Sequence, residues 1–538
     1  MILKFAIHWE HYARNKLCAV CWTFGNLPPG SSSALSSIYL ALLCKVDFVK
    51  EHGYQKLFEP LLHDLVTLEQ EGVFIPQLGS FIKGTVQCVI ADNLGAHGLA
   101  GFIESFSGKY FCRFCTAQLS DIQKLEVKSG VFDRGTKEVH QLHIKTCEEK
   151  GVSCFGVRTG CVLTKSLSHF NVISGYPPDI VHDLFEGIVP VELAKCIAVL
   201  ISKKLFTLQH LNNLILSFPY KCGDKTNRPH VLPKNLQQKH TIGGNAHENW
   251  CLLRLLPLIV GKLVLIDEPA WQVILYLKDI GDLVVANVHT LESIAYLECT
   301  ISDHRKCYQA LFPDQKLLPK HHFLEHYPEM IKCFGPLVSL WTMRFEAKHS
   351  FFKQVVRHIH NFRNVTFTLA NKHQLMVAYN LLRPDNEKSS LEVLQTSRVS
   401  IDILHDDVVN SLVQKHPEIS EINLAQSVTV NGIRYKKGMI VVHGSCGGLP
   451  GFSEIMQLCI IKDELTFIVK ELNFYYREHY RAFELHPTRE FAAVDQKELA
   501  DHYPLAEYKV GSLRMVTLKR FVHVAGKFNF FLVVTSDL

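Results

Sequence analysis

Two cysteines and a later group of histidines have the residue types and the order of a four-ligand metal site. Cys112 and Cys115 are separated by two residues, so both thiolates can bind one ion from a single turn. His321, His322 and His326 follow much later in the chain, and a mixture of thiolate and imidazole ligands favours tetrahedral Zn²⁺. The pattern predicts a structural zinc bound by Cys112, Cys115, His326 and either His321 or His322. The alternative is two buried thiols and a histidine-rich helix start.

Two carboxylates stand near these ligands in the sequence. Asp92 ends the apolar run that starts at Val86, and Glu346 opens a helix rich in basic residues. Two-metal phosphodiester chemistry needs acidic residues that hold Mg²⁺ or Mn²⁺ ions about 3.5–4 Å apart. Asp92 and Glu346 are therefore candidate catalytic ligands. The competing interpretations are a helix N-cap for Asp92 and an ordinary first-turn carboxylate for Glu346.

Basic residues surround and follow Glu346, with phenylalanines between them. We select Arg344, Lys348, Lys353 and Arg357 as candidate DNA-binding residues, because a basic stripe can follow a phosphate backbone. A solvated basic helix face is the alternative. The chain could also form a homo-oligomer.

The elements that must position these residues differ along the chain. Residues 84–91 form an expected buried strand, and residues 95–106 an expected helix, which together indicate an α/β layer. From Asp183 to about Phe312 the apolar spacing is helical almost throughout, as in an insertion between the two halves of one site. From about Val428 the pattern alternates and is punctuated by Gly and Asn, which predicts short antiparallel strands and a small barrel.

Composition restricts the classes of protein. The chain has 538 residues, of which 47% are hydrophobic and 20% charged, so it should fold into several domains. The net charge of +5 is small, so any nucleic-acid footprint must be local. No signal peptide is recognisable at the start, and the most apolar tract, residues 251–266, contains two basic residues. Seventeen cysteines then indicate a reducing compartment. We expect a nuclear or cytoplasmic protein that is not secreted and has no membrane span.

In order and spacing, these motifs resemble eukaryotic cut-and-paste DDE transposases that carry a zinc-bearing insertion. These are the CACTA/Mirage/Chapaev type and the Transib type, the latter related to the catalytic subunit of the V(D)J recombinase. The resemblance rests on Asp-Asn-Leu-Gly-Ala-His from Asp92, Arg-Phe-Glu-Ala-Lys-His from Arg344, and Pro-Pro-Asp-Ile-Val-His-Asp-Leu-Phe-Glu-Gly from Pro177. It implies an RNase H-like fold, H-x4-H zinc ligands at His321 and His326, and a catalytic role for Asp92 and Glu346.

The chain departs from this family pattern at its start. The family's first catalytic Asp lies on the opening strand of the sheet, but residues 1–17 contain no Asp, and His8-Trp-Glu10-His is no evident substitute. Leu17 onward fits a second or third strand, so we expect the opening strand to be missing. The resemblance then implies a transposon-derived protein that is catalytically inactive and retains DNA binding. The alternatives are an active enzyme with Asp179 or Asp183 as the third ligand, or an intracellular scaffold without a nucleic-acid role.

The expected fold is an RNase H-like α/β core with a large helical insertion and a small C-terminal β domain. Its expected divisions are a partial core lacking its first strand (17–115), a zinc-linked helical insertion (116–320), a closing segment with the second zinc half and the Glu-bearing helix (321–382), a linker (383–425) and a barrel-like β domain (426–538).

Overall fold

The computed structural model describes residues 1–12, 15–28, 31, 34–359, 363–382, 391–446 and 448–523. The chain forms two compact units, each built from two separate stretches of sequence. The core unit comprises Met1–Pro190 and Leu291–Arg383, and the appended unit comprises Val191–Thr290 and Pro384–Leu538. Residues 383–390, the start of the expected linker, lie outside the described residues.

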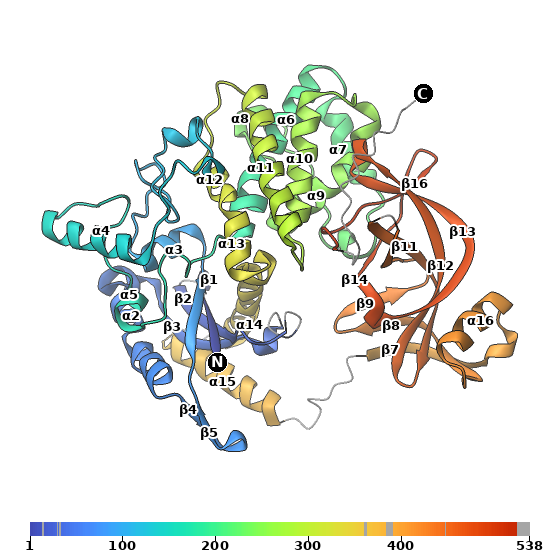
Figure 1. Cartoon of the computed structure of the whole chain (residues 1–538), viewed down its shortest axis with the longest axis horizontal. Helices are drawn as coiled ribbons and strands as arrows, with labels where there is room; N and C mark the ends of the chain where they lie inside the picture. Colours follow the sequence, from blue (N-terminus) through green and yellow to red (C-terminus); the bar gives the residue numbers. More distant parts are fainter. Residues whose placement is uncertain are drawn as a thin grey trace. The chain divides into compact units, whose positions relative to one another are not determined.

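The core unit contains a four-stranded sheet of order β3-β2-β1-β6 (Figure 1). Its strands are β1 (Ile2–Tyr12), β2 (Asn15–Phe24), β3 (Tyr39–Lys45) and β6 (Thr85–Ile90). β1 pairs antiparallel with β2, β2 pairs antiparallel with β3, and β6 joins the other side of β1 in parallel. The chain must therefore cross over between β3 and β6, and α2 (Val46–Gln70) lies in this connection.

β1 corrects the expectation that the opening strand of the sheet is missing. It lies inside the sheet and pairs with β2 from Leu3 opposite Phe24 to Tyr12 opposite Asn15. Leu3, Phe5 and Ile7 alternate along it and are buried. This alternation is the sequence signal of a half-buried strand. The residues of β1 contain no Asp, so the family pattern alone does not identify it as the opening strand.

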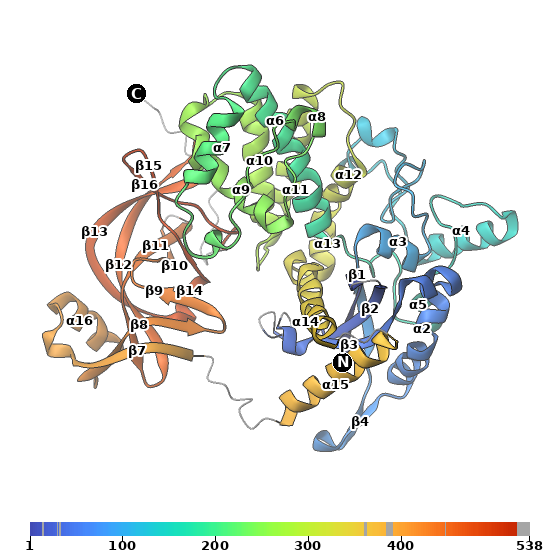
Figure 2. The same cartoon turned by 180° about the vertical axis from the view of Figure 1, so that it is seen from behind.

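Helices cover both faces of this sheet. Leu3 and Phe5 of β1 share a hydrophobic core with Leu57 and Phe58 of α2. On the opposite face, His8 of β1 contacts α14 (Met343–Ile359), whose neighbour α15 (Val365–Leu382) packs against β3 (Figure 2). α3 (Asn93–Ala100) starts directly after β6. β6 thus leads directly into α3, and β1 contacts the beginning of α14 at His8.

The other helices and strands of the core unit are peripheral to the sheet. They are β4 (Val73–Ile75), β5 (Ser80–Ile82), α4 (Lys137–Lys150), α5 (Val162–Ser166), a π-helix (Val181–Ile188), α11 (Leu291–Leu311), α12 (Pro319–Glu325) and α13 (Tyr327–Phe334). α6 (Val189–Ser202) leads from the core unit into the appended unit. Among the described residues, no helix is both long enough and apolar enough to cross a bilayer.

The appended unit combines helices with a curled, ten-stranded antiparallel sheet. Its helices include α7 (Leu208–Ser217), α8 (Leu236–Lys239), α9 (Ala246–Val260), α10 (Pro269–Val284) and α16 (Asp406–Lys415). Its strands are β7 (Leu391–Ser400), β8 (Glu421–Val430), β9 (Ile433–Lys436), β10 (Ile440–Cys446), β11 (Leu449–Ile461), β12 (Glu464–Arg477), β13 (Ala482–Asp495), β14 (Leu499–Leu505), β15 (Tyr508–Val510) and β16 (Leu513–Val516).

A buried ion pair joins the helices of the appended unit to its sheet. Arg254 of α9 pairs with Asp224, and the hydroxyl of Tyr508 in β15 donates to the same carboxylate at 2.8 Å. Residues 191–290 therefore belong with the C-terminal strands and are not part of one insertion spanning 116–320. The expected linker is also wrong from residue 391 onward, because β7 and α16 lie there.

Candidate metal centre

Four buried ligands from two distant segments converge in the core unit. Cys112, Cys115, His322 and His326, here called the metal cluster, present ligand atoms that all lie within 4.8 Å of one another. The two cysteines come from an irregular loop after α3, whereas the histidines lie on α12 and at its C-terminal end. The sequence prediction that these two segments form one site is therefore consistent with the geometry.

The distances between the ligand atoms suit one tetrahedral ion. Cys115 Sγ lies 3.1 Å from His322 Nε2, Cys112 Sγ lies 3.6 Å from His326 Nε2, and the two Nε2 atoms are 3.2 Å apart. Zn–S bonds of about 2.3 Å and Zn–N bonds of about 2.0–2.1 Å place tetrahedral S and N ligands roughly 3.5 Å apart, and two N ligands roughly 3.3 Å apart. This buried Cys2His2 cluster can bind a metal ion, and its donors match the preferences of zinc.

The second histidine pair is His322 and His326, not His321 and His326. Residues four apart lie on the same face of a helix, so α12 directs His322 and His326 together toward the cysteines. The Nδ1 of His321 instead accepts a hydrogen bond from the Leu318 N–H at 3.0 Å, and its ring lies 5.5 Å from that of Tyr308. The preference for His321, which came from the family spacing, is therefore wrong.

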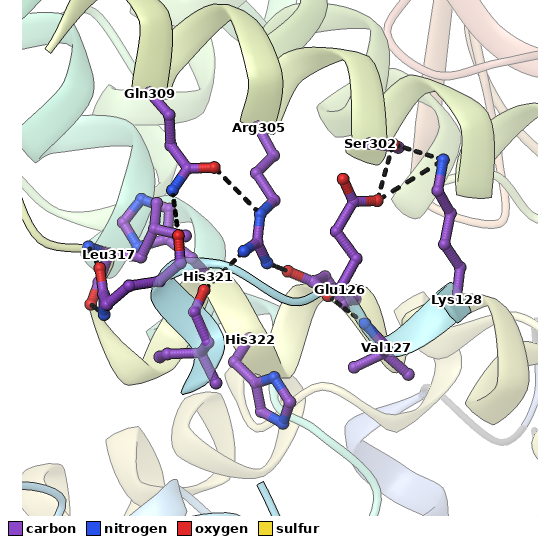
Figure 3. A network of polar contacts seen from close by, with 12 residues as sticks. Glu126, Val127, Lys128, Ser302, Arg305, Gln309, Leu317, His321 and His322 are labelled. Carbon is purple, nitrogen blue, oxygen red and sulfur yellow. Dashed lines mark hydrogen bonds and ion pairs between the residues drawn. The ribbon is translucent and has the colours of Figure 1, made fainter. Parts of the chain in front are cut away.

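A polar network holds α12 against the chain that follows the cysteines (Figure 3). Arg305 of α11 forms an ion pair with Glu325 of α12 and donates to the carbonyl of Ile122 at 2.6 Å. Glu325 also accepts from the Val127 N–H at 2.7 Å. In Figure 3, His321 lies on the side of this network where Leu317 and Gln309 are, separate from His322. The network fixes the direction of α12 and hence that of its histidines.

The surroundings of the metal cluster are aromatic, and its four ligands are buried. The ring of His322 lies 5.4 Å from Phe111 and 5.6 Å from Phe132, and that of His326 lies 5.2 Å from Phe114. Burial opposes ionisation of Cys112, but the hydrogen bond from Cys115 and the nearby imidazoles hold the pKa of this thiol well below its usual value. The thiolate is the metal-binding form of cysteine. The surroundings thus favour the thiolate form of Cys112, whereas the hydrogen bond to Cys112, together with burial, raises the pKa of Cys115.

Asp92 caps a helix, as its alternative interpretation proposed. It is the N-cap residue of α3, and its Oδ1 accepts from the Gly95 N–H at 2.7 Å. Its location is nevertheless the one expected of a site residue. Ala6 of β1 pairs with Ile90 of β6, so His8 and Asp92 each lie two residues beyond this pair; His8 is still within β1 and paired with β2, whereas Asp92 follows the end of β6.

Glu346 meets β1, and its partner there is a histidine. His8 Nε2 lies 3.6 Å from Glu346 Oε1, and the His8 ring lies 4.8 Å from that of His349. We call Asp92, Glu346 and His8 the carboxylate corner. His8 therefore contacts Glu346 and lies as far beyond the Ala6–Ile90 pair as Asp92 does. This contact places His8 beside Glu346, and it does not make His8 a substitute for a catalytic Asp.

A second histidine adds positive charge near Glu346. His182 of the π-helix donates from Nδ1 to the buried carboxylate of Asp179 at 2.5 Å. Although burial alone would lower it, the hydrogen bond and charge of Asp179, with a smaller contribution from Glu346, raise the pKa of His182 to about 9. His182 is consequently a cation at neutral pH. Asp179 also accepts from Thr342, so both of its oxygens have hydrogen-bond partners.

Asp183, the other proposed substitute ligand, is committed to internal hydrogen bonds. It is fully buried and accepts from Asn93 Nδ2 at 2.5 Å and from the Tyr327 hydroxyl at 3.3 Å. Burial raises its pKa to about 6, against the opposing effect of Arg113. Within the described part of the chain, the metal cluster is the one group of three or more such ligands that converges this closely. Asp92, Glu346, Asp179 and Asp183 are outside it.

The basic residues of α14 do not form one exposed stripe. Arg344 and Arg357 are exposed and Lys353 is half-buried, but Lys348 is buried and donates to the Leu35 carbonyl at 2.8 Å. Burial lowers the pKa of Lys348. Lys348 is therefore a structural residue, and the prediction that it contacts DNA is wrong.

Sequence reasoning missed His8, His182 and Asn93 as members of the two sites. The alternation of Leu3, Phe5 and Ile7 was the available signal for His8, because it places β1 in the sheet. For Asn93 no local signal existed, since its partners lie far away in sequence.

No protein-family model and no curated protein matches the chain.

Proposed function

We propose that this chain is a transposon-derived, DDE transposase-like protein with an RNase H-like core, a structural zinc and no catalytic activity. The observation that carries the proposal is the arrangement around β1. Asp92 follows the parallel neighbour of β1, and Glu346 lies on a helix packed against it. A site of this family would have an Asp on β1 itself, whereas this chain has His8. The fold and the order of motifs support the origin, and the substitution supports the loss of activity.

Electrostatics supports an inactive carboxylate corner. Each Mg²⁺ ion needs carboxylate ligands that offset its dehydration and hold its geometry. Here Glu346 lies against His8 and near the cationic His182, and Asp92 caps α3. An imidazole lies beside Glu346 where a negative ligand would be needed, and the other histidine near Glu346 is paired with Asp179. We expect the purified chain to produce no Mn²⁺-dependent nicks in duplex or hairpin DNA. Robust nicking that Glu346→Gln abolishes would overturn the proposed inactivity.

Zinc is the ion we propose for the metal cluster. Two thiolates and two imidazoles at tetrahedral distances support zinc over the oxygen-preferring Mg²⁺ and Ca²⁺. We expect stoichiometric zinc in the purified chain by elemental analysis. His322→Ala should lose it, while the adjacent control His321→Ala should retain it. Equal loss from both variants would contradict the proposed ligand set.

DNA is the partner that we propose for the exposed basic residues at the two ends of α14. Arg344 and Arg357 are exposed, and Lys353 is half-buried. Because phosphate contacts release counterions, the logarithm of the association constant should fall linearly with the logarithm of the salt concentration. We expect Arg344→Glu/Arg357→Glu to reduce affinity for a mixed-sequence duplex at least tenfold in fluorescence anisotropy. Unchanged affinity would favour the alternative of a protein without a nucleic-acid role.

A further inference from the structure

Each half of the metal cluster is followed in sequence by a residue that belongs to one buried polar network. Arg113 follows Cys112 and Tyr327 follows His326. The Arg113 side chain is only 2% exposed, and it donates to the Asn93 side chain at 2.8 Å and to the carbonyls of Tyr176 and Pro177 at 3.2 Å each. The loop that carries the cysteines is therefore fastened to the turn after β6.

Asp183 completes this network and connects it to the histidine half. Its Oδ1 accepts from Asn93 Nδ2, and its Oδ2 accepts from the Tyr327 hydroxyl. Asn93 thus accepts from Arg113 and donates to Asp183, so three hydrogen bonds link Arg113, which follows Cys112, to Tyr327, which follows His326. One carboxylate, 0% exposed, is common to both halves of the metal cluster.

Among the described residues, no protein group accepts a hydrogen bond from the second ring nitrogen of His322 or His326. A metal-binding imidazole ordinarily donates its second ring N–H to a carboxylate, carbonyl or water. The Nδ1 atoms of both His322 and His326 are buried and have no hydrogen-bond partner among the described residues. Their positions must therefore depend on packing and on how the backbone around them is anchored. Tyr327 anchors the residue directly after His326.

Charge gives a further reason why Asp183 matters. The Arg113 guanidinium is buried, and an uncompensated buried charge is strongly destabilising. Asp183 supplies nearby negative charge, which opposes the effect of burial on the pKa of Arg113. Loss of the Asp183 charge would therefore release the loop that carries Cys112 and Cys115 as well as Tyr327.

We propose that Asp183 is a positioning residue for the metal cluster, and that it couples metal affinity to the turn that carries Asp92 and Asn93. The inference rests on the proposed metal binding, because it assigns a role toward that ion. Asp183 does not touch the ion; it acts through Asn93, Arg113 and Tyr327.

The test compares zinc affinities of three full-length variants with that of the unmodified chain by chelator competition. Asp183→Asn removes the charge, and Tyr327→Phe removes one hydroxyl and leaves the ring. Tyr176→Phe is the matched control, since its buried hydroxyl contacts Cys161 and not Asp183. Outer partners of metal ligands typically change affinity about 10–100-fold. We expect a loss in this range for Asp183→Asn, a smaller loss for Tyr327→Phe, and none for the control.

The outcomes separate the inference from the proposal on which it rests. If the unmodified chain binds no zinc, the proposed metal binding fails and the inference fails with it. If that chain binds zinc and Asp183→Asn and Tyr327→Phe bind it equally well, the positioning role is overturned while the metal site stands. If Asp183→Asn fails to fold, the zinc affinities of Tyr327→Phe and Tyr176→Phe are compared instead, and a loss in Tyr327→Phe alone supports the positioning role. An equal loss in the control would mean that general core packing sets the affinity, which also overturns the inference.

Discussion

The metal cluster and the carboxylate corner lie in the same unit, but their candidate ligands differ in whether they converge on one point or contact other partners. The four side chains of the metal cluster converge within 4.8 Å. In the carboxylate corner, Asp92 bonds to the backbone of its own helix and Glu346 lies against His8. The comparison teaches that residue type and position in the fold do not suffice for a metal site. The ligands must also be free of other partners and carry compatible charge.

The largest expected effect comes from dismantling the metal cluster. Cys112→Ser/Cys115→Ser should abolish zinc binding and lower the melting temperature of the zinc-loaded chain by about 10 °C or more, because binding of a structural ion contributes directly to folding. Elemental analysis and thermal unfolding measure the two effects. The matched control is Cys299→Ser/Cys333→Ser, which alters two exposed cysteines of the same unit. Zinc retained by the first variant would remove the contrast between the two sites.

The next prediction attempts to convert the carboxylate corner into a metal site. His8→Asp places a third carboxylate on β1 beside Glu346, so Mn²⁺ affinity should rise at least tenfold, or about 1.4 kcal/mol. Titration of Mn²⁺ by electron paramagnetic resonance measures it. His8→Asn is the control, because it removes the imidazole without adding charge. An equal gain in the control would mean that the imidazole alone blocks the site.

A third prediction concerns the cation near Glu346. Because the pKa of folded His182 is raised to about 9 from an ordinary value of 6.5, its pairing with Asp179 adds stability that is complete below pH 6.5 and is lost as pH rises through 9. We expect the difference in unfolding free energy between the unmodified chain and His182→Gln to shrink by about 2 kcal/mol from pH 6 to pH 10, after allowing for partial solvent exposure. Denaturant unfolding measures it. A difference independent of pH would mean that His182 is not charged in the folded chain.

These two sites also differ in how far the sequence predicts them. The C-x-x-C spacing and the later histidines are local patterns, so the two halves of the metal cluster could be found without a structure. Helical geometry favours His322, because it lies four residues before His326. The family spacing favours His321, and following it led to the wrong ligand. The family pattern expects an Asp on the opening strand, so it does not identify His8. The alternation from Leu3 to Ile7 nevertheless predicts the strand on which His8 lies.

Long-range packing accounts for what the sequence could not predict. The helices of residues 191–290 belong with the C-terminal strands through contacts such as Asp224 with Arg254 and Tyr508, whose positions have no recognisable spacing. The burial of Lys348 has the same origin, because its partner is the carbonyl of Leu35, more than three hundred residues earlier. The sequence shows which residues of a helix are charged, but it does not show which distant segments of the chain bury them.

The smallest expected effect tests whether Asp92 is now only a structural residue. An N-cap aspartate typically contributes about 1 kcal/mol, and asparagine caps a helix about equally well. We therefore expect Asp92→Ala to lower the free energy of unfolding by about 1 kcal/mol and Asp92→Asn to change it by less than about 0.5 kcal/mol. Denaturant unfolding with Mg²⁺ and with a chelator distinguishes the two roles. If Asp92 held a metal ion, Mg²⁺ would stabilise the unmodified chain and not Asp92→Asn. If Mg²⁺ stabilises the unmodified chain and Asp92→Asn removes this effect, the carboxylate corner binds metal and does not differ from the metal cluster in this respect.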